Sequence, residues 1–377
     1  MKRLFSVFLI LTLLSIPAAA VTGTPSVEAE SALLMEKETG TVLYAKNEHE
    51  KLEPASVTKV MTMLLIAEAL GSGTISLDDM VTTSAYAASM GGSQVYLEEG
   101  EQMSVNDMLK AIAVASGNDA SVAMAEYIAG SEEIFVARMN ERAAELGMAD
   151  TTFKNCTGLP AQGHVTSAYD IALMSRALLS HSVIRNYTTI WIDSLRGGAF
   201  GLANTNKLVR FYSGTTGLKT GSTDSALYCL SATAERDGME LIAVIMKSPT
   251  STKRFESAKS LLNFGFANYA LVKASPDEAL LPVEVNLGEV PEIQPVLEGS
   301  SHILVEKSQV SSLKKTVSLC KEVDAPVIAG QKLGEMTVTS GDKELAVIPI
   351  VAAEDVPKLT WGKILGRFMD TIFMGGK

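Results

Sequence analysis

Strand-forming segments stand at both ends of a long, mostly helical stretch, and this order restricts the folds open to the chain. Residues 31–47 read SALLMEKETGTVLYAKN, which predicts two strands around a turn at Lys37 to Gly40. Far downstream, ALYCLSATA and MELIAVIMK flank ERDG, which predicts a hairpin with Asp237 and Gly238 at its tip. We therefore expect an α+β domain over residues 25–272, with a sheet that the intervening helices cover.

Three segments between and after these strands have helical patterns. The segment VNDMLKAIAVAS follows Ser104, which with Asp107 resembles an acidic capping box. The segment TSAYDIALMSRALLSH has one apolar face, and a third helix is expected from about Thr252 to Tyr269. Past Pro276 the pattern changes to short alternating strands, which predicts a small all-β module over residues 277–353.

The N-terminus predicts export. Residues 1–20 read MKRLFSVFLILTLLSIPAAA, with two basic residues, an apolar run and then small residues, so we expect a signal peptide cleaved after Ala20. Its removal takes two positive charges, so Lys+Arg falls from 32 to 30 against 43 Asp+Glu and the formal net charge changes from −11 to −13. An acidic exported chain is a poor binder of nucleic acid.

The cysteines and histidines point to no metal or cofactor. Cys156, Cys229 and Cys320 are odd in number and form no C-x-x-C pair, which leaves at most one disulfide open and suggests no zinc site. The chain contains no H-E-x-x-H, G-x-S-x-G or G-x-x-x-x-G-K segment. His164 lies in a loop with nothing in sequence to orient it toward a nucleophile, so a structural role is favoured.

The C-terminal residues 357–377 predict an amphipathic helix. At about 100° per residue, the apolar residues share one side, and they are Trp361, Ile364, Leu365, Phe368, Met369, Ile372 and Phe373. The segment is too short and too charged to span a bilayer comfortably, so we favour an in-plane membrane anchor. The alternative is a helix that packs on the β module.

The most informative short motif is S-x-x-K in PASVTKVMT. The pattern occurs five times, and four copies fall in the strand-rich module, where residues three apart point to opposite faces: Ser311/Lys314, Ser312/Lys315, Ser318/Lys321 and Ser340/Lys343. Only Ser56 and Lys59 stand at the start of a helix, where residues three apart share one face. There the helix dipole favours negative charge near Ser56, and a buried Lys59 that is neutral part of the time can take the hydroxyl proton. Taken alone, the pair is better explained as a helix cap and a snorkelling lysine.

Two further motifs change that balance. Ser116-Gly117-Asn118 comes where the helix that starts near Val105 should end, and Lys219-Thr220-Gly221 is the only K-T-G in the chain. The order S-x-x-K, S-x-N, K-T-G is the set described for penicillin-binding proteins and class A β-lactamases. A second S-x-N, at Ser104, is better explained as a helix cap. The three motifs together indicate acyl transfer by a serine nucleophile.

With these motifs, the chain resembles the serine-type D-alanyl-D-alanine carboxypeptidases, which are low-molecular-mass penicillin-binding proteins of the bacterial cell wall. The resemblance also includes TGLPAQGHVTSAYDIA, NTNKLV, GLKTGST, APVIAGQKLG and the terminal helix. It implies a β-lactamase/transpeptidase-like domain with an antiparallel sheet, followed by a β-sandwich-like module. It also implies a peptidoglycan pentapeptide as substrate, β-lactams as covalent inhibitors, no cofactor, and a location on the outer face of the cytoplasmic membrane.

The resemblance implies a role for each site residue. Ser56 would attack the carbonyl of the penultimate D-alanine, Lys59 would accept its proton, and Ser116 would relay a proton to the leaving amine. Asn118 would hold the substrate amide. Lys219, Thr220 and, by resemblance only, Arg254 would bind the terminal carboxylate. The backbone N–H groups of Ser56 and Ser222 would form the oxyanion hole. Independently of the resemblance, a second lysine charge nearby would lower the proton affinity of Lys59, so we expect Lys219 to have this effect.

Two other functions remain open at this stage. A β-lactamase of the same fold would need a glutamate that activates water, and no E-x-x-L-N segment follows Asn118. A β-lactam or muropeptide sensor would acylate at Ser56 without turning over. The one noted departure from the family is Leu227, where many members carry glycine.

Overall fold

The computed structural model describes residues 23–299 and 302–366. Its centre is a five-stranded antiparallel sheet in the order β2-β1-β9-β8-β7, so the edge strand β7 and the early strand β1 belong to one sheet despite their distance in sequence. The strands are β1 (Ser31–Glu36), β2 (Val42–Lys46), β7 (Thr215–Thr223), β8 (Leu227–Arg236) and β9 (Met239–Ser248). This sheet confirms the expected early strand pair and the hairpin at residues 226–247.

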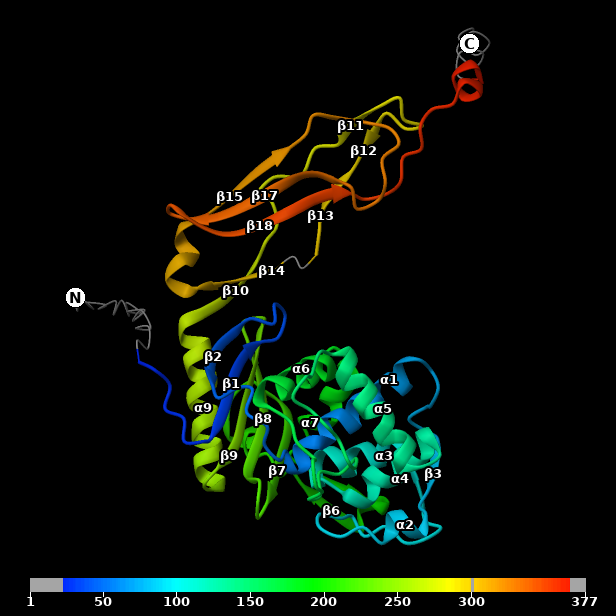
Figure 1. Ribbon diagram of the computed structural model, residues 1–377, viewed down its shortest axis with the longest axis vertical. Helices are drawn as coiled ribbons and strands as arrows, with labels where there is room; N and C mark the ends of the chain where they lie inside the picture. The colour runs from blue at the N-terminus through cyan, green and yellow to red at the C-terminus, as the bar shows by residue number, and fades with distance from the viewer. Residues whose placement is uncertain (1–22, 300–301, 367–377) are drawn as a thin grey trace, which may run out of the picture.

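Helices cover both faces of the sheet (Figure 1). Leu33 and Met35 of β1 point into one core and Leu34 into the other, because successive side chains of a strand face opposite ways. On one face lies α9 (Ser251–Asn268), where Leu261 and Leu262 are fully buried. The other face carries most of the remaining helices of this domain, among which α1 (Lys59–Gly71) and α6 (Ala168–Leu179) lie near the centre, whereas Leu208 joins the core on the α9 side.

The helical region has further short elements. They are η1 (Ala55–Thr58), β3 (Met80–Thr82), α2 (Ala85–Ala88), β4 (Gln102–Ser104), α3 (Val105–Lys110), η2 (Ala111–Ala115), α4 (Asn118–Ala129), α5 (Glu132–Glu145), η3 (Ser182–Ile184), α7 (Arg185–Thr188), β5 (Ile192–Leu195), η4 (Arg196–Gly198), β6 (Phe200–Ala203) and α8 (Leu208–Phe211). Ser104 caps α3 by accepting the Asp107 N–H, as the sequence predicted, and Ser167 caps α6 in the same way. The segment expected as one helix up to Ser116 continues from α3 into a π-helical turn, η2.

The C-terminal module is all β, as expected from its alternating pattern. Its strands form sheets in the orders β10-β14, β12-β11-β16 and β13-β18-β17-β15. Its elements are β10 (Tyr269–Lys273), β11 (Val283–Asn286), β12 (Glu292–Ile293), β13 (Pro295–Leu297), β14 (His302–Glu306), η5 (Lys307–Ser312), β15 (Leu313–Leu319), β16 (Glu322–Asp324), β17 (Lys332–Ser340) and β18 (Lys343–Ala352). Strand β10 follows α9 directly and lies almost entirely within the range expected for the first domain. It nevertheless pairs with β14 of the C-terminal module.

The two ends of the chain are only partly described. The expected signal peptide, residues 1–20, lies outside the described residues, as do residues 367–377 of the expected C-terminal helix. Residues 361–366 are helical, and Lys358 and Leu359 just before them pair with Gly288 and Leu287 of the β module. Within residues 23–299 and 302–366, each helix is too short or too polar to cross a bilayer.

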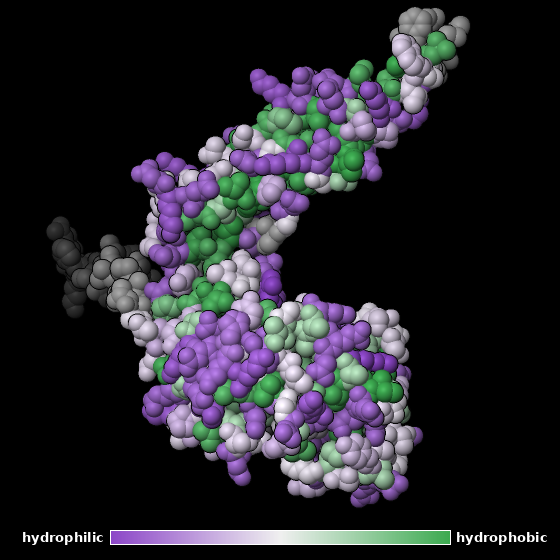
Figure 2. All heavy atoms as spheres, viewed as in Figure 1, coloured by the Kyte–Doolittle hydropathy of each residue, from purple (hydrophilic) through white to green (hydrophobic). Residues whose placement is uncertain are grey.

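Exposed apolar side chains are frequent on the β module. In the space-filling view, a hydrophobic band runs along the module, whereas the visible face of the larger domain is mostly hydrophilic (Figure 2). Leu281, Leu287 and Ile328 of the module are at least 63% exposed, and Trp361 beyond it is 87% exposed. These exposed apolar side chains are available for contact with a partner molecule or a lipid surface.

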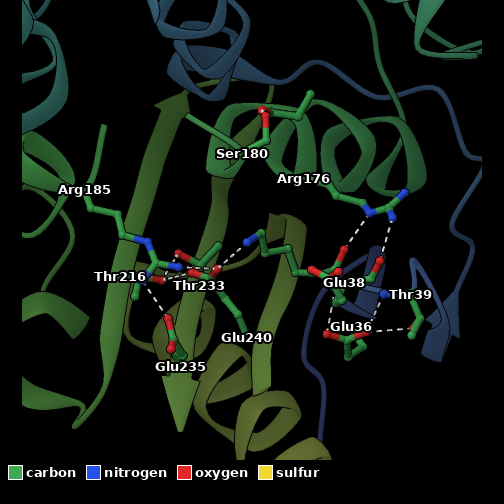
Figure 3. Close-up of polar contacts among 12 residues, drawn as sticks. Glu36, Glu38, Thr39, Arg176, Ser180, Arg185, Thr216, Thr233, Glu235 and Glu240 are labelled. Atoms are coloured by element: carbon green, nitrogen blue, oxygen red, sulfur yellow. Dashed lines mark hydrogen bonds and ion pairs between the residues drawn. The ribbon is translucent and has the colours of Figure 1, made fainter. Parts of the chain in front are cut away.

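A polar network fixes the start of the edge strand β7 (Figure 3). The buried carboxylate of Glu240 on β9 accepts a hydrogen bond from Thr216 Oγ1 of β7 at 2.7 Å and from Arg185 Nη2 of α7 at 2.6 Å. Lys37, in the turn after β1, lies 3.5 Å from the same carboxylate. Arg185 also donates to Glu235 at 2.6 Å. The network therefore joins β7, β9 and α7 three residues before Lys219.

We expect Glu240→Gln to lower the free energy of unfolding by about 1–3 kcal/mol, because it leaves charged donors facing a neutral amide in a buried position. Glu235→Gln is the matched control, since it removes a carboxylate from the same arginine at a side chain that is 38% exposed rather than 5%. That control should cost less than about 1 kcal/mol. Urea denaturation of both variants measures the difference, and equal losses would contradict the role assigned to Glu240.

Candidate active site

Ser56 and Lys59 meet at the junction of η1 and α1. Ser56 lies in the 3-10 turn η1, and α1 begins at Lys59, so the serine precedes the α-helix by one turn as the sequence predicted. Lys59 Nζ lies 3.1 Å from Ser56 Oγ. Ser56 is half-buried, whereas Lys59 is completely buried. A partly exposed hydroxyl therefore lies against an amine that is fully buried.

The other contacts of Lys59 suit an uncharged amine. Nζ donates to Asn118 Oδ1 at 2.6 Å and to the Thr157 carbonyl at 2.7 Å. A neutral amine has two hydrogens and one lone pair, so these two acceptors use both hydrogens and leave the lone pair for the Ser56 hydroxyl. This geometry places Lys59 within reach of the Ser56 proton as a general base.

Burial lowers the pKa of Lys59 to about 7, although the Asp119 carboxylate acts in the opposite direction. Burial also lowers the pKa of Lys219 well below its usual value, and the charges of Lys59 and then Arg254 lower it further. The sequence suggested burial and a second cation, Lys219, as causes of the Lys59 shift, and desolvation is the cause that lowers this pKa. Because Lys219 itself loses its proton readily, it adds little repulsion until a carboxylate restores its charge.

Two glycines shape the backbone around the nucleophile. A Cβ on Gly221 of β7 would lie 2.9 Å from the Ser56 nitrogen, and one on Gly158 would lie 1.9 Å from the Ala55 carbonyl oxygen. The Ala55–Ser56 peptide is thus enclosed between β7 and the 157–158 loop. Ala55 has a φ of +49°, a left-handed conformation that costs a non-glycine residue about 1–2 kcal/mol.

The S-x-N motif lies at the end of η2, where the chain turns into α4. Ser116 has a φ of +65° and is 4% exposed, and among the described residues no hydrogen bond occupies its hydroxyl. Asn118 joins Lys59 to the 91–93 loop, because its Nδ2 donates to the Gly91 carbonyl at 2.7 Å. The neighbouring Asp119 carboxylate accepts the Val95 and Leu97 N–H groups. The motif therefore holds the loop at 91–97 against the lysine.

The K-T-G motif occupies the edge strand, which runs beside η1. Lys219 is 1% exposed and donates to the Thr220 carbonyl at 2.9 Å, while Thr220 Oγ1 donates to Thr205 Oγ1 at 2.7 Å. Ser222 is exposed one residue beyond Gly221. In the described part of the chain, no carboxylate pairs with Lys59, Lys219 or Arg254, so these basic groups remain available to an anionic ligand, whose charge would favour their protonated forms.

Arg254 contacts the backbone of the strands beside the site. Its Nη1 donates to the carbonyls of Gly221 and Cys229 at 3.1 Å each, and its Nη2 donates to Ser251 Oγ at 3.3 Å. Burial lowers its pKa to about 10. These contacts brace β7 against α9. A direct contact with a substrate carboxylate stays a prediction.

The backbone conformation at Leu227 suits the glycine that many family members carry there. At the start of β8 it has a φ of +51°, a conformation that glycine adopts without steric cost. Its side chain is 36% exposed at the end of the hairpin that joins β7 to β8. The leucine therefore carries local strain, and its apolar side chain offers no polar contact to the site.

Several site features were not predicted from the sequence. The Thr157 carbonyl binds Lys59, and Gly158 makes room for the peptide before Ser56, yet neither carries a distinctive side chain. Their only sequence signal was the TGLP segment shared with the family. Asp119 was also missed, although its place directly after S-x-N could have suggested a helix N-terminal acid.

Known proteins resemble the chain over nearly its full length. The family described as D-alanyl-D-alanine carboxypeptidase matches residues 18–250, and the one described as penicillin-binding protein 5, C-terminal domain, matches residues 273–358. D-alanyl-D-alanine carboxypeptidase DacF of Bacillus subtilis (strain 168) is 44% identical over 384 residues, covering 98% of each chain. DacC of Escherichia coli (strain K12) is 34% identical and covers 93% of this chain and 89% of its own.

Solved structures support the same likeness. Penicillin-binding protein 5 from Haemophilus influenzae superimposes with a TM-score of 0.80 at 29% identity, covering 89% of this chain and 99% of that one. Penicillin-binding protein 6B from Escherichia coli gives a TM-score of 0.73 at 32% identity, covering 87% and 96%. These matches confirm the expected fold class, a penicillin-binding protein domain followed by a β module.

The pKa of Lys59 makes the reactivity of Ser56 dependent on pH. Because the neutral amine is the base, the rate at which Ser56 reacts with an activated thioester should rise about tenfold per pH unit below pH 7 and level off above it. Mass spectrometry of the intact protein from pH 5 to 9 measures this rate. In Lys59→Ala the step near pH 7 should vanish along with most of the reaction, and a flat wild-type profile would exclude Lys59 as the base.

Proposed function

The chain belongs to the D-alanyl-D-alanine carboxypeptidase family, and on that premise we propose that Ser56 is the nucleophile with which it removes the terminal D-alanine from peptidoglycan pentapeptides. Membership makes the chain a serine-type peptidase and a penicillin-binding protein. One observation carries the residue assignment: a buried amine with both hydrogens engaged lies 3.1 Å from the Ser56 hydroxyl.

In the proposed acylation, the substrate carboxylate binds at Lys219 and Thr220. The bound negative charge raises the pKa of Lys219 and so restores its proton. Ser56 Oγ attacks the carbonyl carbon of the penultimate D-alanine while Lys59 Nζ takes the hydroxyl proton. The backbone N–H groups of Ser56 and Ser222 then stabilise the negative oxygen of the tetrahedral intermediate.

Collapse of that intermediate breaks the peptide bond. The leaving nitrogen of the terminal D-alanine needs a proton, and the Ser116 hydroxyl, which has no partner among the described residues, relays it from Lys59. Asn118 holds the substrate amide while its other contacts keep Lys59 in place. Water then hydrolyses the Ser56 ester, with Lys59 again as the base. A β-lactam acylates Ser56 by the same steps, since its reactive bond is also an amide.

The contacts of the site favour this function over a β-lactamase, and turnover separates it from a sensor. A β-lactamase needs a carboxylate that activates water at the acyl-ester, and in the described residues no carboxylate bonds to Ser56 or Lys59. A sensor and a peptidase share the acylation step, including proton transfer to the leaving nitrogen, and differ in whether the acyl-ester is then hydrolysed. Release of D-alanine separates the peptidase from the sensor, and rapid nitrocefin hydrolysis would indicate a β-lactamase.

We expect Ser56→Ala to abolish both D-alanine release from a pentapeptide and covalent labelling by fluorescent penicillin, because the acyl-ester bond cannot form. Ser222→Ala is the matched control, since it removes an equally simple hydroxyl but keeps the backbone N–H, and it should still be labelled. Gel fluorescence and an assay for free D-alanine measure the two activities. Labelling of Ser56→Ala would refute the nucleophile assignment.

We also propose that residues 1–20 direct export of the enzyme and that the C-terminal helix holds it at the outer face of the cytoplasmic membrane. The exposed apolar side chains at the start of this helix support the proposal, since Trp361 is 87% and Leu365 63% exposed. Lys363 forms an ion pair with Glu289 at 2.5 Å, which ties the helix to the end of the β module. The expected partners are therefore the peptidoglycan stem peptide and a lipid surface.

A chain that ends at Thr360 should remain folded and active but no longer sediment with phospholipid vesicles. The cut keeps Lys358 and Leu359, whose backbones pair with the β module, and removes the apolar face that would enter the lipid interface. Vesicle co-sedimentation of both proteins checks the result, with penicillin labelling as the control for folding. Undiminished sedimentation of the shortened chain would rule out the helix as the anchor.

A further inference from the structure

His164 lies one side chain away from the turn that carries Ser56, although the sequence favoured a purely structural loop residue. The His164 Nε2 atom lies 2.9 Å from Thr58 Oγ1. Thr58 Oγ1 in turn donates to the carbonyl oxygen of Ala55 at 2.9 Å. Ala55 directly precedes the nucleophile, so a chain of hydrogen bonds runs from the 154–164 loop to the Ala55–Ser56 peptide.

The direction of each hydrogen bond in this chain follows from one backbone group. The Lys154 N–H can only donate, and it lies 3.2 Å from His164 Nδ1, so Nδ1 is the acceptor. The single proton of the neutral ring is therefore on Nε2, which donates to Thr58 Oγ1. Because Thr58 Oγ1 accepts that hydrogen bond, its own hydrogen is directed to the Ala55 carbonyl.

The surroundings of His164 keep the ring neutral. The side chain is 3% exposed and its ring meets Phe153 edge-on at 5.8 Å. Burial lowers its pKa to about 4, Lys154 lowers it further, and Glu53 opposes the shift. Protonation of Nδ1 would place a hydrogen against the Lys154 N–H. Across the working pH range, the ring is therefore a fixed donor at Nε2 and a fixed acceptor at Nδ1.

The accepting carbonyl belongs to a strained residue. Ala55 holds a left-handed φ of +49°, and such a conformation persists only where its surroundings over-determine it. Gly158 and Gly221 lie against the two sides of the Ala55–Ser56 peptide, but they fix only its position between them. The hydrogen bond from the Thr58 hydroxyl is a directional side-chain contact on the Ala55 carbonyl, so it restricts the rotation of this peptide and with it the direction of the Ser56 N–H.

We propose that His164 is a positioning residue, which acts through Thr58 to hold the Ala55–Ser56 peptide so that the Ser56 N–H points into the oxyanion hole. The inference rests on the proposed function, since it assumes that Ser56 is the nucleophile. His164 touches neither the substrate nor a transferred proton. Loss of the relay should leave carboxylate binding at Lys219 and the base Lys59 intact, and it should slow both formation and hydrolysis of the acyl-ester.

Thr58→Val is the sharpest test, because valine keeps the volume and removes only the hydroxyl. We expect the acylation rate constant with penicillin and kcat for D-alanine release to fall roughly 10- to 100-fold, the scale of a small misplacement of reacting groups. KM should change less than threefold, and the pH profile should keep its step near 7 with a lower plateau. Stopped-flow labelling and steady-state assays provide these values.

His164→Phe should produce the same pattern, and the double variant should be no slower than the slower single variant, because both changes break one relay. His164→Gln should recover part of the rate, since its amide can still donate to Thr58. Tyr212→Phe is the matched control. It removes one hydroxyl that donates to Asn263 at 2.8 Å on the α9 side of the sheet, so the rates should stay within twofold.

The outcomes separate the relay from general destabilisation and from a failure of the proposed function. If Thr58→Val labels at the wild-type rate, the inference is wrong, whatever happens to its melting temperature. Multiplicative effects of the two single changes would likewise overturn it. If wild-type protein is not labelled, or Ser56→Ala is labelled as well as wild type, the proposed function fails instead. His164→Phe that does not fold leaves the decision to Thr58→Val.

Discussion

A lysine amine buried without an acidic partner is the constraint on which the site depends. Removal from water lowers the pKa of Lys59 to about 7, and two neutral acceptors, Asn118 Oδ1 and the Thr157 carbonyl, occupy its hydrogens. An adjacent carboxylate would hold the amine in its charged form and remove its basicity. The chain therefore buries a basic side chain without a carboxylate partner, and a strongly shifted pKa of this kind is more frequent at functional sites than in structural ion pairs.

The rest of the fold brings three distant segments to this amine. Helix α1 carries Lys59, helix α4 begins at Asn118, and the edge strand β7 lies against η1, which carries Ser56. The approach of β7 is close enough that a side chain would block it, since a Cβ on Gly221 would lie 2.9 Å from the Ser56 nitrogen. Strands from both ends of the domain form the sheet, and β7 is its edge strand. One side of β7 is therefore free to lie against η1.

Charged groups are arranged differently at two positions along the edge strand β7. Around Glu240, cations and carboxylates are matched, and the network stabilises the start of β7. Three residues later, Lys219 has no acidic partner among the described residues and so remains available to an incoming carboxylate. The same strand is therefore held by paired charges at Thr216 and carries an unpaired basic side chain at Lys219, where we propose that the substrate carboxylate binds.

The sequence by itself determined the chemistry and most of the elements. Ser56 with Lys59, Ser116 with Asn118 and Lys219 with Thr220 could be read directly, because side-chain type and local spacing decide what such motifs can do. The hairpin of β8 and β9 and the caps at Ser104 and Ser167 are also local. Only the tertiary structure decided that the Thr157 carbonyl would bind Lys59, that Gly158 would face Ala55, and that His164 would reach Thr58 across 106 residues. Backbone groups look alike in every sequence, and the partner of a buried polar atom depends on which distant segments the core brings together.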